Sequence, residues 1–370
     1  MALSFQDPNL HAIHRKISAG ERLSFEDGMT LYGSHDLPGI GRLADQVRRR
    51  LHDDKVFYIV NRHLNYTNIC KNLCRFCAFA RPIGADGGFA MSLDEAKTWV
   101  LAHPEKTVHE IHIVGGLNPA LPMDYYLDLL RTVRKARPEA VIKAFTAVEI
   151  DHLAKISGKS LREVISSLKE AGLGMLPGGG AEIMSERIHA LLFPEKIDGS
   201  RWLEITEAVH EAGIPTNATM LYGHLETIEE RVAHLLKLRS LQDKTSGFLA
   251  FIPLAFHAKN TTLSHLPPTT AVDDLKTIAV ARLLLDNIPH IKAYWVMIGE
   301  KLAQTALFFG ADDLDGTIVE EKISHTAGAT SAKGLTRAEL TRLITAAGFS
   351  PVERDSFYHP VEPQGGPCPC

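Results

Sequence analysis

Three cysteines, Cys70, Cys74 and Cys77, lie within eight residues of one another in the spacing Cys-x3-Cys-x2-Cys. Thiolates at this density in a soluble chain are typically metal ligands. A structural zinc site needs four ligands in a closed tetrahedral shell. Three cysteines on a four-iron cluster leave one iron open to bind a further molecule, so the count indicates a site that carries out chemistry. A zinc site completed by His63 is the main alternative, and a simple electron-transfer or scaffold protein is a different class of answer.

The composition of the chain is that of a soluble globular protein. Its 370 residues are 45% hydrophobic and 23% charged, which suits one large α/β barrel or two modest domains. The net charge of −4 gives no reason to expect nucleic acid or an anionic membrane as partner. Residues 1–8 lack the pattern of a secretory signal, and no apolar run is long enough to span a bilayer. Because most of its few cysteines are clustered, we expect the chain in the reducing cytoplasm.

Short apolar runs alternate with amphipathic segments from Val56 onward, at a period of roughly 30–40 residues, which is typical of βα units and a parallel sheet. We expect strands over residues 56–60, 63–67, 110–114, 141–147, 172–176, 215–221, 248–254, 291–298 and 312–315. Counted from residue 63, these give about eight strands, which predicts an α/β fold of the closed (β/α)8 TIM-type barrel class. An open barrel of six units is the near alternative.

The chain is predicted to divide into three parts. Residues 1–55 form a helical extension at the N-terminal end, and residues 56–330 form the barrel. Residues 331–370 hold a last helix over 335–347 and a loose C-terminal tail rich in Pro and Gly. The tail carries Cys368 and Cys370, whose role the sequence leaves open.

The unusual residues of the sequence follow the predicted strands. The carboxyl ends of strands are where a parallel barrel carries out its chemistry. The cysteine loop follows the strand that ends at Thr67, and Gly115-Gly116 follows the next. A run of three glycines that leads to Glu182 follows the fourth. Glycines in such places let the backbone approach a ligand closely, so one face of the barrel is the predicted site.

The cysteine loop, with Phe76 just before its last cysteine, resembles the signature loop of the radical S-adenosylmethionine (SAM) superfamily. In that superfamily the open iron chelates the amino and carboxylate groups of SAM, and one electron then releases a 5′-deoxyadenosyl radical. The resemblance implies a [4Fe–4S] cluster on Cys70, Cys74 and Cys77, with SAM as co-substrate. It also implies a set of cofactor-binding residues: Phe76, Gly115, Gly116, Thr146, Glu149, Gly179, Gly180 and Glu182.

Within this set the resemblance implies separate tasks. Gly115-Gly116 would bind the methionine end of SAM, and Glu182 would accept hydrogen bonds from the ribose hydroxyls. The superfamily usually continues the glycine pair with Glu, where this sequence has Leu117.

A closer resemblance rests on motifs spread along the chain. These are residues 65–68, 77–79, 112–117, 143–152, 177–182, 217–224, 251–257, 293–297 and 312–317. They resemble the menaquinone and deazaflavin branch of radical SAM enzymes, and most of all the aminofutalosine synthases, over roughly residues 24–329. This implies addition of the adenosyl radical to 3-[(1-carboxyvinyl)oxy]benzoate, with aryl migration and loss of carboxylate, to give 6-amino-6-deoxyfutalosine. Dehypoxanthine futalosine cyclase is the main rival, and the deazaflavin-forming synthase is a more distant one.

The implied substrate is a small dicarboxylate, so its pocket needs cations or hydrogen-bond donors inside a closed apolar chamber. The substrate-binding residues expected from this are Asn65, Tyr66, Arg81, Asn217, Thr219, Tyr222, His257 and Trp295, with Arg62 and His224 as further candidates. The side chains that could close the chamber are Phe79, Phe145, Phe256, Tyr294 and Trp295. An electron donor such as flavodoxin or ferredoxin is the implied protein partner.

Overall fold

The computed structural model describes residues 4–102, 107–319 and 321–361. Its strands are β1 (Lys55–Ile59), β2 (Asn61–Leu64), β3 (Glu110–Ile113), β4 (Val141–Ala144), β5 (Leu173–Met175), β6 (Thr216–Tyr222), β7 (Phe248–Ala255), β8 (His290–Ile291), β9 (Asp313–Gly316) and β10 (Ser350–Glu353). Its longer helices are α1 (Leu10–Ala19), α2 (Phe25–Gly33), α3 (Leu37–His52), α4 (Leu93–Leu101), α5 (Met123–Ala136), α6 (Ala147–Ser157), α7 (Leu161–Ala171), α9 (Gly199–Glu211), α10 (Ile228–Thr245), α11 (Ala271–Leu284) and α15 (Arg337–Ala346). Shorter turns of helix are α8 (Glu186–Leu192), α12 (Trp295–Ile298), α13 (Glu300–Ala306), η1 (Leu307–Phe309) and α14 (Ile323–Thr326).

The strands form a closed parallel ring. Three sheets, β2-β3-β4-β5, β6-β7-β8 and β10-β1-β9, account for the regular pairing. Single parallel bridges join them: Leu176 to Thr216, Lys292 to Asp313 and Arg62 to Val319. Because β1 and β2 are successive stretches of one extended segment, the ring has eight positions, and the prediction of a (β/α)8 barrel is confirmed.

Helices pack around this ring, and polar N-cap residues mark where they begin. The hydroxyl groups of Ser92, before α4, and Ser160, before α7, each accept a hydrogen bond from the backbone N–H of the Glu three residues later. The carboxylate of that Glu in turn accepts a hydrogen bond from the serine backbone N–H. These two capping boxes fix where each helix begins. Buried strands such as β6, in which every residue is buried, are covered on both faces.

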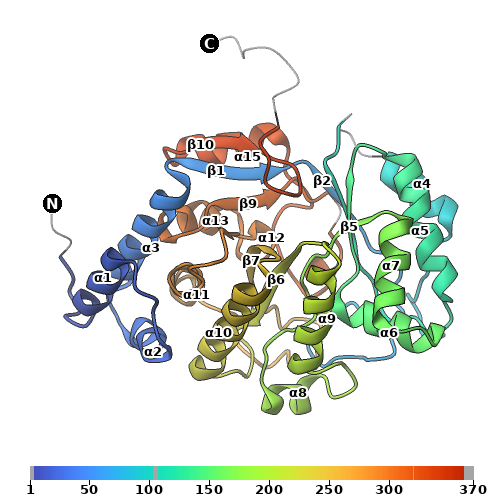
Figure 1. Ribbon diagram of the computed structural model, residues 1–370, viewed down its shortest axis with the longest axis horizontal. Coiled ribbons are helices and arrows are strands. Elements are labelled where there is room, and N and C mark those ends of the chain that lie inside the picture. Colours follow the sequence, from blue (N-terminus) through green and yellow to red (C-terminus); the bar gives the residue numbers. More distant parts are fainter. Residues whose placement is uncertain (1–3, 103–106, 320, 362–370) are drawn as a thin grey trace, which may run out of the picture.

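The N-terminal segment is helical, as predicted, and α3 packs against α11 on the outside of the barrel (Figure 1). Where one part of the chain ends and the next begins stays a prediction. No helix in the described ranges is both long and apolar enough to cross a membrane.

The strand expected over residues 291–298 is wrong. β8 ends at Ile291, and residues 295–298 form the short helix α12, closed by a hydrogen bond of 2.8 Å from the Gly299 N–H to the Trp295 carbonyl. A short apolar run that is buried on all sides has no period that separates strand from helix.

β10 was not predicted from the sequence; it lies next to α15, in the part predicted to hold only a helix and a tail. β10 pairs in parallel with β1, whose other neighbour is β9 (Figure 1). Its sequence, Ser350-Pro351-Val352-Glu353, has neither alternation nor an apolar run, so local pattern gave no signal. The predictions for residues 362–370, including Cys368 and Cys370, lie outside the described residues.

A buried ion pair fixes this C-terminal segment to the barrel. Nε of Arg354, just after β10, donates to Oδ2 of Asp313 in β9 at 2.7 Å, and both side chains are almost fully buried. The guanidinium also lies 4.1 Å from the centroid of the Tyr358 ring. Two parts of the sequence far apart are therefore joined where water is excluded.

We predict that Arg354→Met lowers the free energy of unfolding by about 3–5 kcal/mol, because it leaves the Asp313 carboxylate buried without its cation. Urea denaturation of the full chain measures the change. The matched control is Arg131→Ala, which breaks the exposed pair with Asp128 on α5 and should cost less than about 1 kcal/mol. Equal losses in the two variants would contradict the role given to the buried pair.

Candidate active site

A cavity of about 340 Å³ lies at the carboxyl ends of the barrel strands, beside the cysteine loop. The loop contributes one wall, and the segments that follow β3, β4 and β5 contribute another. β6, β7 and the residues around α12 and α14 complete the lining. The cavity is therefore placed where a parallel barrel brings its catalytic residues together.

Backbone hydrogen bonds hold the cysteine loop against the barrel. The Cys70 N–H donates to the Arg81 carbonyl at 3.0 Å, and the Lys71 N–H donates to the Leu117 carbonyl at 3.1 Å. Gly116 lies so close to the loop that a Cβ there would stand 2.3 Å from the Ile69 carbonyl oxygen. Gly116 is thus needed for the loop to reach its place, whatever it does for a ligand.

Glu149 is the hydrogen-bonding centre of the site. Its Oε1 accepts from the Tyr66 hydroxyl at 2.8 Å and from the Gly115 N–H at 3.2 Å, and its Oε2 accepts from the Thr146 N–H at 2.7 Å. Burial raises the pKa of Glu149 to about 7, although these hydrogen bonds oppose the rise. One carboxylate therefore joins the ends of β2 and β3 to the start of α6.

Glu182 forms an ion pair with Lys196, a residue that the sequence analysis did not select. The Lys196 ammonium lies 5.4 Å from the centroid of the Phe76 ring and 5.2 Å from that of Phe193, so it is held over the cysteine loop. The neighbouring charges of Glu182 and the cysteines raise the pKa of Lys196, although its burial opposes this. A buried positive charge is thus fixed beside the thiols.

The glycine run after β5 has its own steric reason. Gly178 has φ +83°, and a Cβ there would stand 1.9 Å from the Asn217 carbonyl oxygen. Only glycine fits, and the turn then presents Gly179 and Gly180 to the cavity.

The donor set fits an iron–sulfur cluster. Cys70, Cys74 and Cys77 are free, half-buried and all line the cavity. Burial raises the pKa of the Cys74 thiol to about 12 and also raises the pKa of Cys77. Thiols kept neutral by burial become thiolates when a bound metal supplies the opposite charge.

Most of the predicted cluster and cofactor residues line this cavity: Cys70, Cys74, Phe76, Cys77, Gly115, Thr146, Glu149, Gly179, Gly180 and Glu182. Thr219 and His257, predicted for the substrate, line it as well. Phe256 and Tyr294 are the chamber residues that do so. The individual roles given to them stay predictions.

Other predicted residues lie in the packing around the cavity. The Tyr222 hydroxyl donates to Asp274 at 2.8 Å, and the Trp295 indole N–H donates to the Gly316 carbonyl at 3.0 Å. Arg81 donates to the carbonyls of Ala78 and Ala80, both at 2.8 Å, and so closes the cysteine loop upon itself. The polar groups of these three side chains therefore form hydrogen bonds with other protein groups.

Four further predicted residues are absent from the cavity lining and pack behind it: Asn65, Tyr66, Gly116 and Asn217. Asn65 donates to the Val114 carbonyl at 3.1 Å. Asn217 is 1% exposed on β6. Among the further candidates, Arg62 stacks on the Trp99 ring at 4.9 Å, and His224 contacts Glu226 at 3.0 Å. Phe79, Phe145 and Trp295 are buried but pack outside the cavity lining.

Sequence reasoning missed the polar floor of the cavity, where His112, Lys143, Asp315 and Glu321 line it together with His63. Lys143 lies in a strand buried on both faces, and its ammonium contacts the Glu110 carboxylate at 2.6 Å. A charged residue inside such a strand is a signal that could have found the floor.

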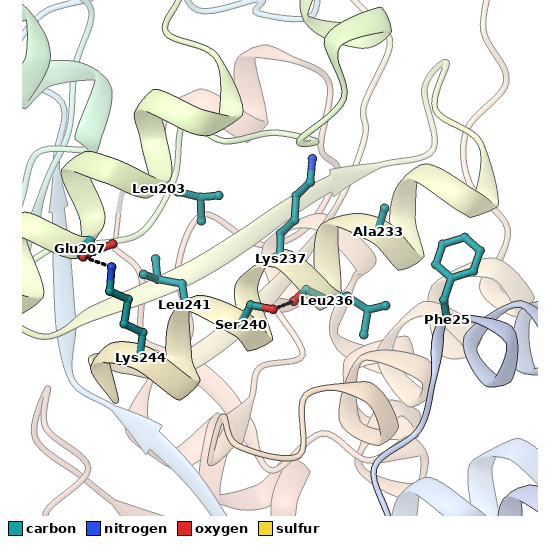
Figure 2. A pocket seen from close by; sticks show the side chains of 9 residues that line it. All are labelled: Phe25, Leu203, Glu207, Ala233, Leu236, Lys237, Ser240, Leu241 and Lys244. Atoms are coloured by element: carbon teal, nitrogen blue, oxygen red, sulfur yellow. Dashed lines mark hydrogen bonds and ion pairs between the residues drawn. The ribbon is translucent and has the colours of Figure 1, made fainter.

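Two other features lie away from the cavity. A depression on the outside of the barrel is lined by α9, α10 and Phe25 of α2, and it holds none of the predicted site residues (Figure 2). His52, His290 and Asp312 bring ligand atoms within 4.8 Å of one another at the amino end of β8. Arg282 pairs with Asp312 there, and His52 contacts the Pro289 carbonyl at 2.8 Å, so hydrogen bonds already use these atoms.

Comparison with known proteins places this geometry in a family. Residues 64–238 match the radical SAM superfamily, and residues 245–364 match the CofH/MqnC C-terminal region. Aminodeoxyfutalosine synthase of Thermus thermophilus is 48% identical over 96% of this chain and 97% of its own length. The chain belongs to the aminofutalosine synthase family of radical SAM enzymes. The family carries a [4Fe–4S] cluster and uses SAM, so the zinc and electron-transfer alternatives fall away.

Other relatives of this radical SAM enzyme outline the branch. Aminodeoxyfutalosine synthase of Streptomyces coelicolor is 43% identical over 96% of this chain and 95% of its own. The 5-amino-6-(D-ribitylamino)uracil–L-tyrosine 4-hydroxyphenyl transferase of Archaeoglobus fulgidus is 43% identical over 86% of this chain and 92% of its own. The structure of methylornithine synthase (PylB) matches with a TM-score of 0.74 at 17% identity, over 92% of this chain and 97% of that one, which supports the fold.

We predict that Glu149→Gln flattens the pH dependence of stability. The pKa of Glu149 in the fold, about 7, exceeds its ordinary 4.5, so its contribution is fully present below pH 4.5 and is lost as the pH rises through 7. The free energy of unfolding of the unaltered chain should fall by about 3 kcal/mol over that range from this group, a fall that the variant lacks. Urea denaturation of the cluster-free chain at several pH values measures it.

The control is Glu95→Gln, which alters the same capping-box position on α4 where the carboxylate is exposed. This variant should keep the slope of the unaltered chain above pH 4.5. Parallel profiles for Glu149→Gln and the unaltered chain would show that the buried carboxylate does not titrate as stated.

Proposed function

We propose that this enzyme joins the 5′-deoxyadenosyl group of SAM to 3-[(1-carboxyvinyl)oxy]benzoate, with aryl migration and loss of carboxylate as bicarbonate or carbon dioxide. The product is 6-amino-6-deoxyfutalosine, an intermediate of menaquinone biosynthesis, and methionine is released. The observation that carries the proposal is the 48% identity to an aminodeoxyfutalosine synthase over nearly the whole of both chains, together with the cavity beside the cysteine loop.

In this proposal Cys70, Cys74 and Cys77 hold the cluster. When bound, the cluster supplies the electron that cleaves SAM, and a small electron carrier such as flavodoxin or ferredoxin supplies that electron in turn. Lys196 places a positive charge beside the cysteines, where the carboxylate of SAM needs one. Glu182, its partner, offers oxygens to the ribose hydroxyls.

The walls of the cavity suit a reaction that must exclude water. Val114, Leu117, Val148 and Leu254 line it with apolar atoms, and Phe256 adds an aromatic face. A reactive carbon radical takes hydrogen from any group in reach, so a tight apolar chamber directs it to the substrate.

One relative and one matched region point to alternative reactions within the branch. The relative from Archaeoglobus fulgidus is named as a transferase acting on tyrosine, and part of this chain matches a region shared with MqnC. A futalosine cyclase would use the adenosyl radical only to remove a hydrogen atom. The fate of the adenosyl group therefore separates the candidates.

We expect anaerobic turnover of the reconstituted enzyme, with SAM, reductant and the dicarboxylate, to yield an adenosylated product whose mass equals that of 6-amino-6-deoxyfutalosine. Mass spectrometry reads both this product and free 5′-deoxyadenosine. Release of 5′-deoxyadenosine in stoichiometric amount with dehypoxanthine futalosine would favour the cyclase. A product formed only with tyrosine and the ribityl uracil would favour the deazaflavin branch.

Glu182→Gln should weaken the binding of SAM roughly 10- to 100-fold, the usual loss for a hydrogen bond to a charged group. Iron content and the absorbance of the cluster should not change, because the cysteines are intact. Equilibrium binding of SAM to the reconstituted enzyme measures the effect. Glu186→Gln, an exposed acid four residues on, is the matched control. Unchanged SAM affinity in Glu182→Gln would remove the ribose assignment.

A further inference from the structure

Three side chains that carry nitrogen stand side by side on the floor of the cavity. His63 on β2 pairs in register with His112 on β3, and His112 pairs in register with Lys143 on β4. All three line the cavity. The two imidazole rings are stacked, with centroids 4.3 Å apart and an interplanar angle of 29°. His112 lies three residues before Gly115, so the two stacked rings stand about 10 Å deeper in the barrel than the glycine pair.

The charges that face these rings are already paired. Lys143 contacts Glu110 at 2.6 Å, and Lys292, just after β8, contacts Asp315 on β9 at 3.2 Å. Glu321 contacts His325 of α14 at 3.2 Å. Beneath them Arg354 binds Asp313. Each positive group on the floor thus has its own carboxylate, and the floor as a whole is close to neutral.

The two histidines differ from these pairs. Within the described residues, neither His63 nor His112 has a hydrogen-bond partner for its ring nitrogens, and burial lowers the pKa of both. An imidazole that is neutral and lacks a partner can take up a proton when an anion arrives. Because the rings are stacked, a second proton would meet the charge of the first, so the pair accepts one.

We propose that the stacked pair of His63 and His112 is the subsite for the ring carboxylate of the substrate, and that the pair takes up one proton as this carboxylate binds. The inference rests on the proposed function, in which the substrate is a dicarboxylate whose vinyl ether carbon has to meet the adenosyl radical formed beside the cysteine loop. An anion entering a neutral, buried floor needs a counter-charge. The protonated pair supplies it, and a charge-assisted hydrogen bond forms to the carboxylate.

The subsite would also set substrate specificity. A ligand without the ring carboxylate places no charge on the floor, so it has no reason to draw a proton. An otherwise identical phenyl vinyl ether, 2-phenoxyacrylate, is therefore the matched ligand. The difference in affinity between the two ligands reports the subsite alone, because every other contact is shared.

The test is calorimetry of the reconstituted, SAM-loaded enzyme in two buffers with different ionisation enthalpies. We expect uptake of about one proton for each dicarboxylate bound at pH 8, where the free histidines are neutral, and none for 2-phenoxyacrylate. In His63→Gln/His112→Gln this uptake should vanish. Affinity for the dicarboxylate should fall roughly 10- to 100-fold while that for 2-phenoxyacrylate stays the same.

Three outcomes would overturn the inference: no proton uptake by the unaltered enzyme, uptake that persists in the double variant, or equal losses for both ligands. The proton count needs no variant, so it decides the matter even if the double variant fails to hold its cluster. Failure of the proposed function looks different. In that case the unaltered enzyme gives no adenosylated product from the dicarboxylate, whereas normal turnover without proton uptake refutes only the subsite.

Discussion

The carboxylate of Glu149, buried and shared between three donors, holds the catalytic end of the barrel in shape. Its partners are the Tyr66 hydroxyl, the Gly115 N–H and the Thr146 N–H, which come from three neighbouring parts of the ring. Unpaired, each of these buried donors would cost about 1–3 kcal/mol. The cysteine loop starts four residues after Tyr66, so the same carboxylate sets where the loop leaves the barrel.

The position of the loop then limits what can stand across from it. Gly116, in the segment after β3, lets the loop come into contact with that segment, and Gly178 lets the turn after β5 pass the backbone of β6. Between these two close approaches lies the cavity, with Lys196 held over Phe76 on one side. The two glycines therefore set how close the backbone segments on either side of the cavity can come.

The sequence predicted what depends on local spacing. The cysteine loop and the eight-position ring come from short patterns, and these are confirmed. It could not separate residues that face the cavity from residues that support it. Tyr222 and Trp295 have polar tips that need partners whether or not a ligand is present, and here Asp274 and the Gly316 carbonyl provide them. Lys196 and the floor histidines depend on strand register and chain folding, which no local pattern carries.

The pairing of β1 has a consequence for biosynthesis. Its neighbours in the sheet, β9 and β10, begin at residues 313 and 350, so the ribosome makes them after most of the chain has emerged. Until then the backbone groups of residues 55–59 have no strand beside them and form an open edge of the kind that invites aggregation. Maturation would follow the same order. The cavity beside the thiols at residues 70–77 is lined in part by Asp315, Glu321 and Ala327, so it is complete only near the end of translation.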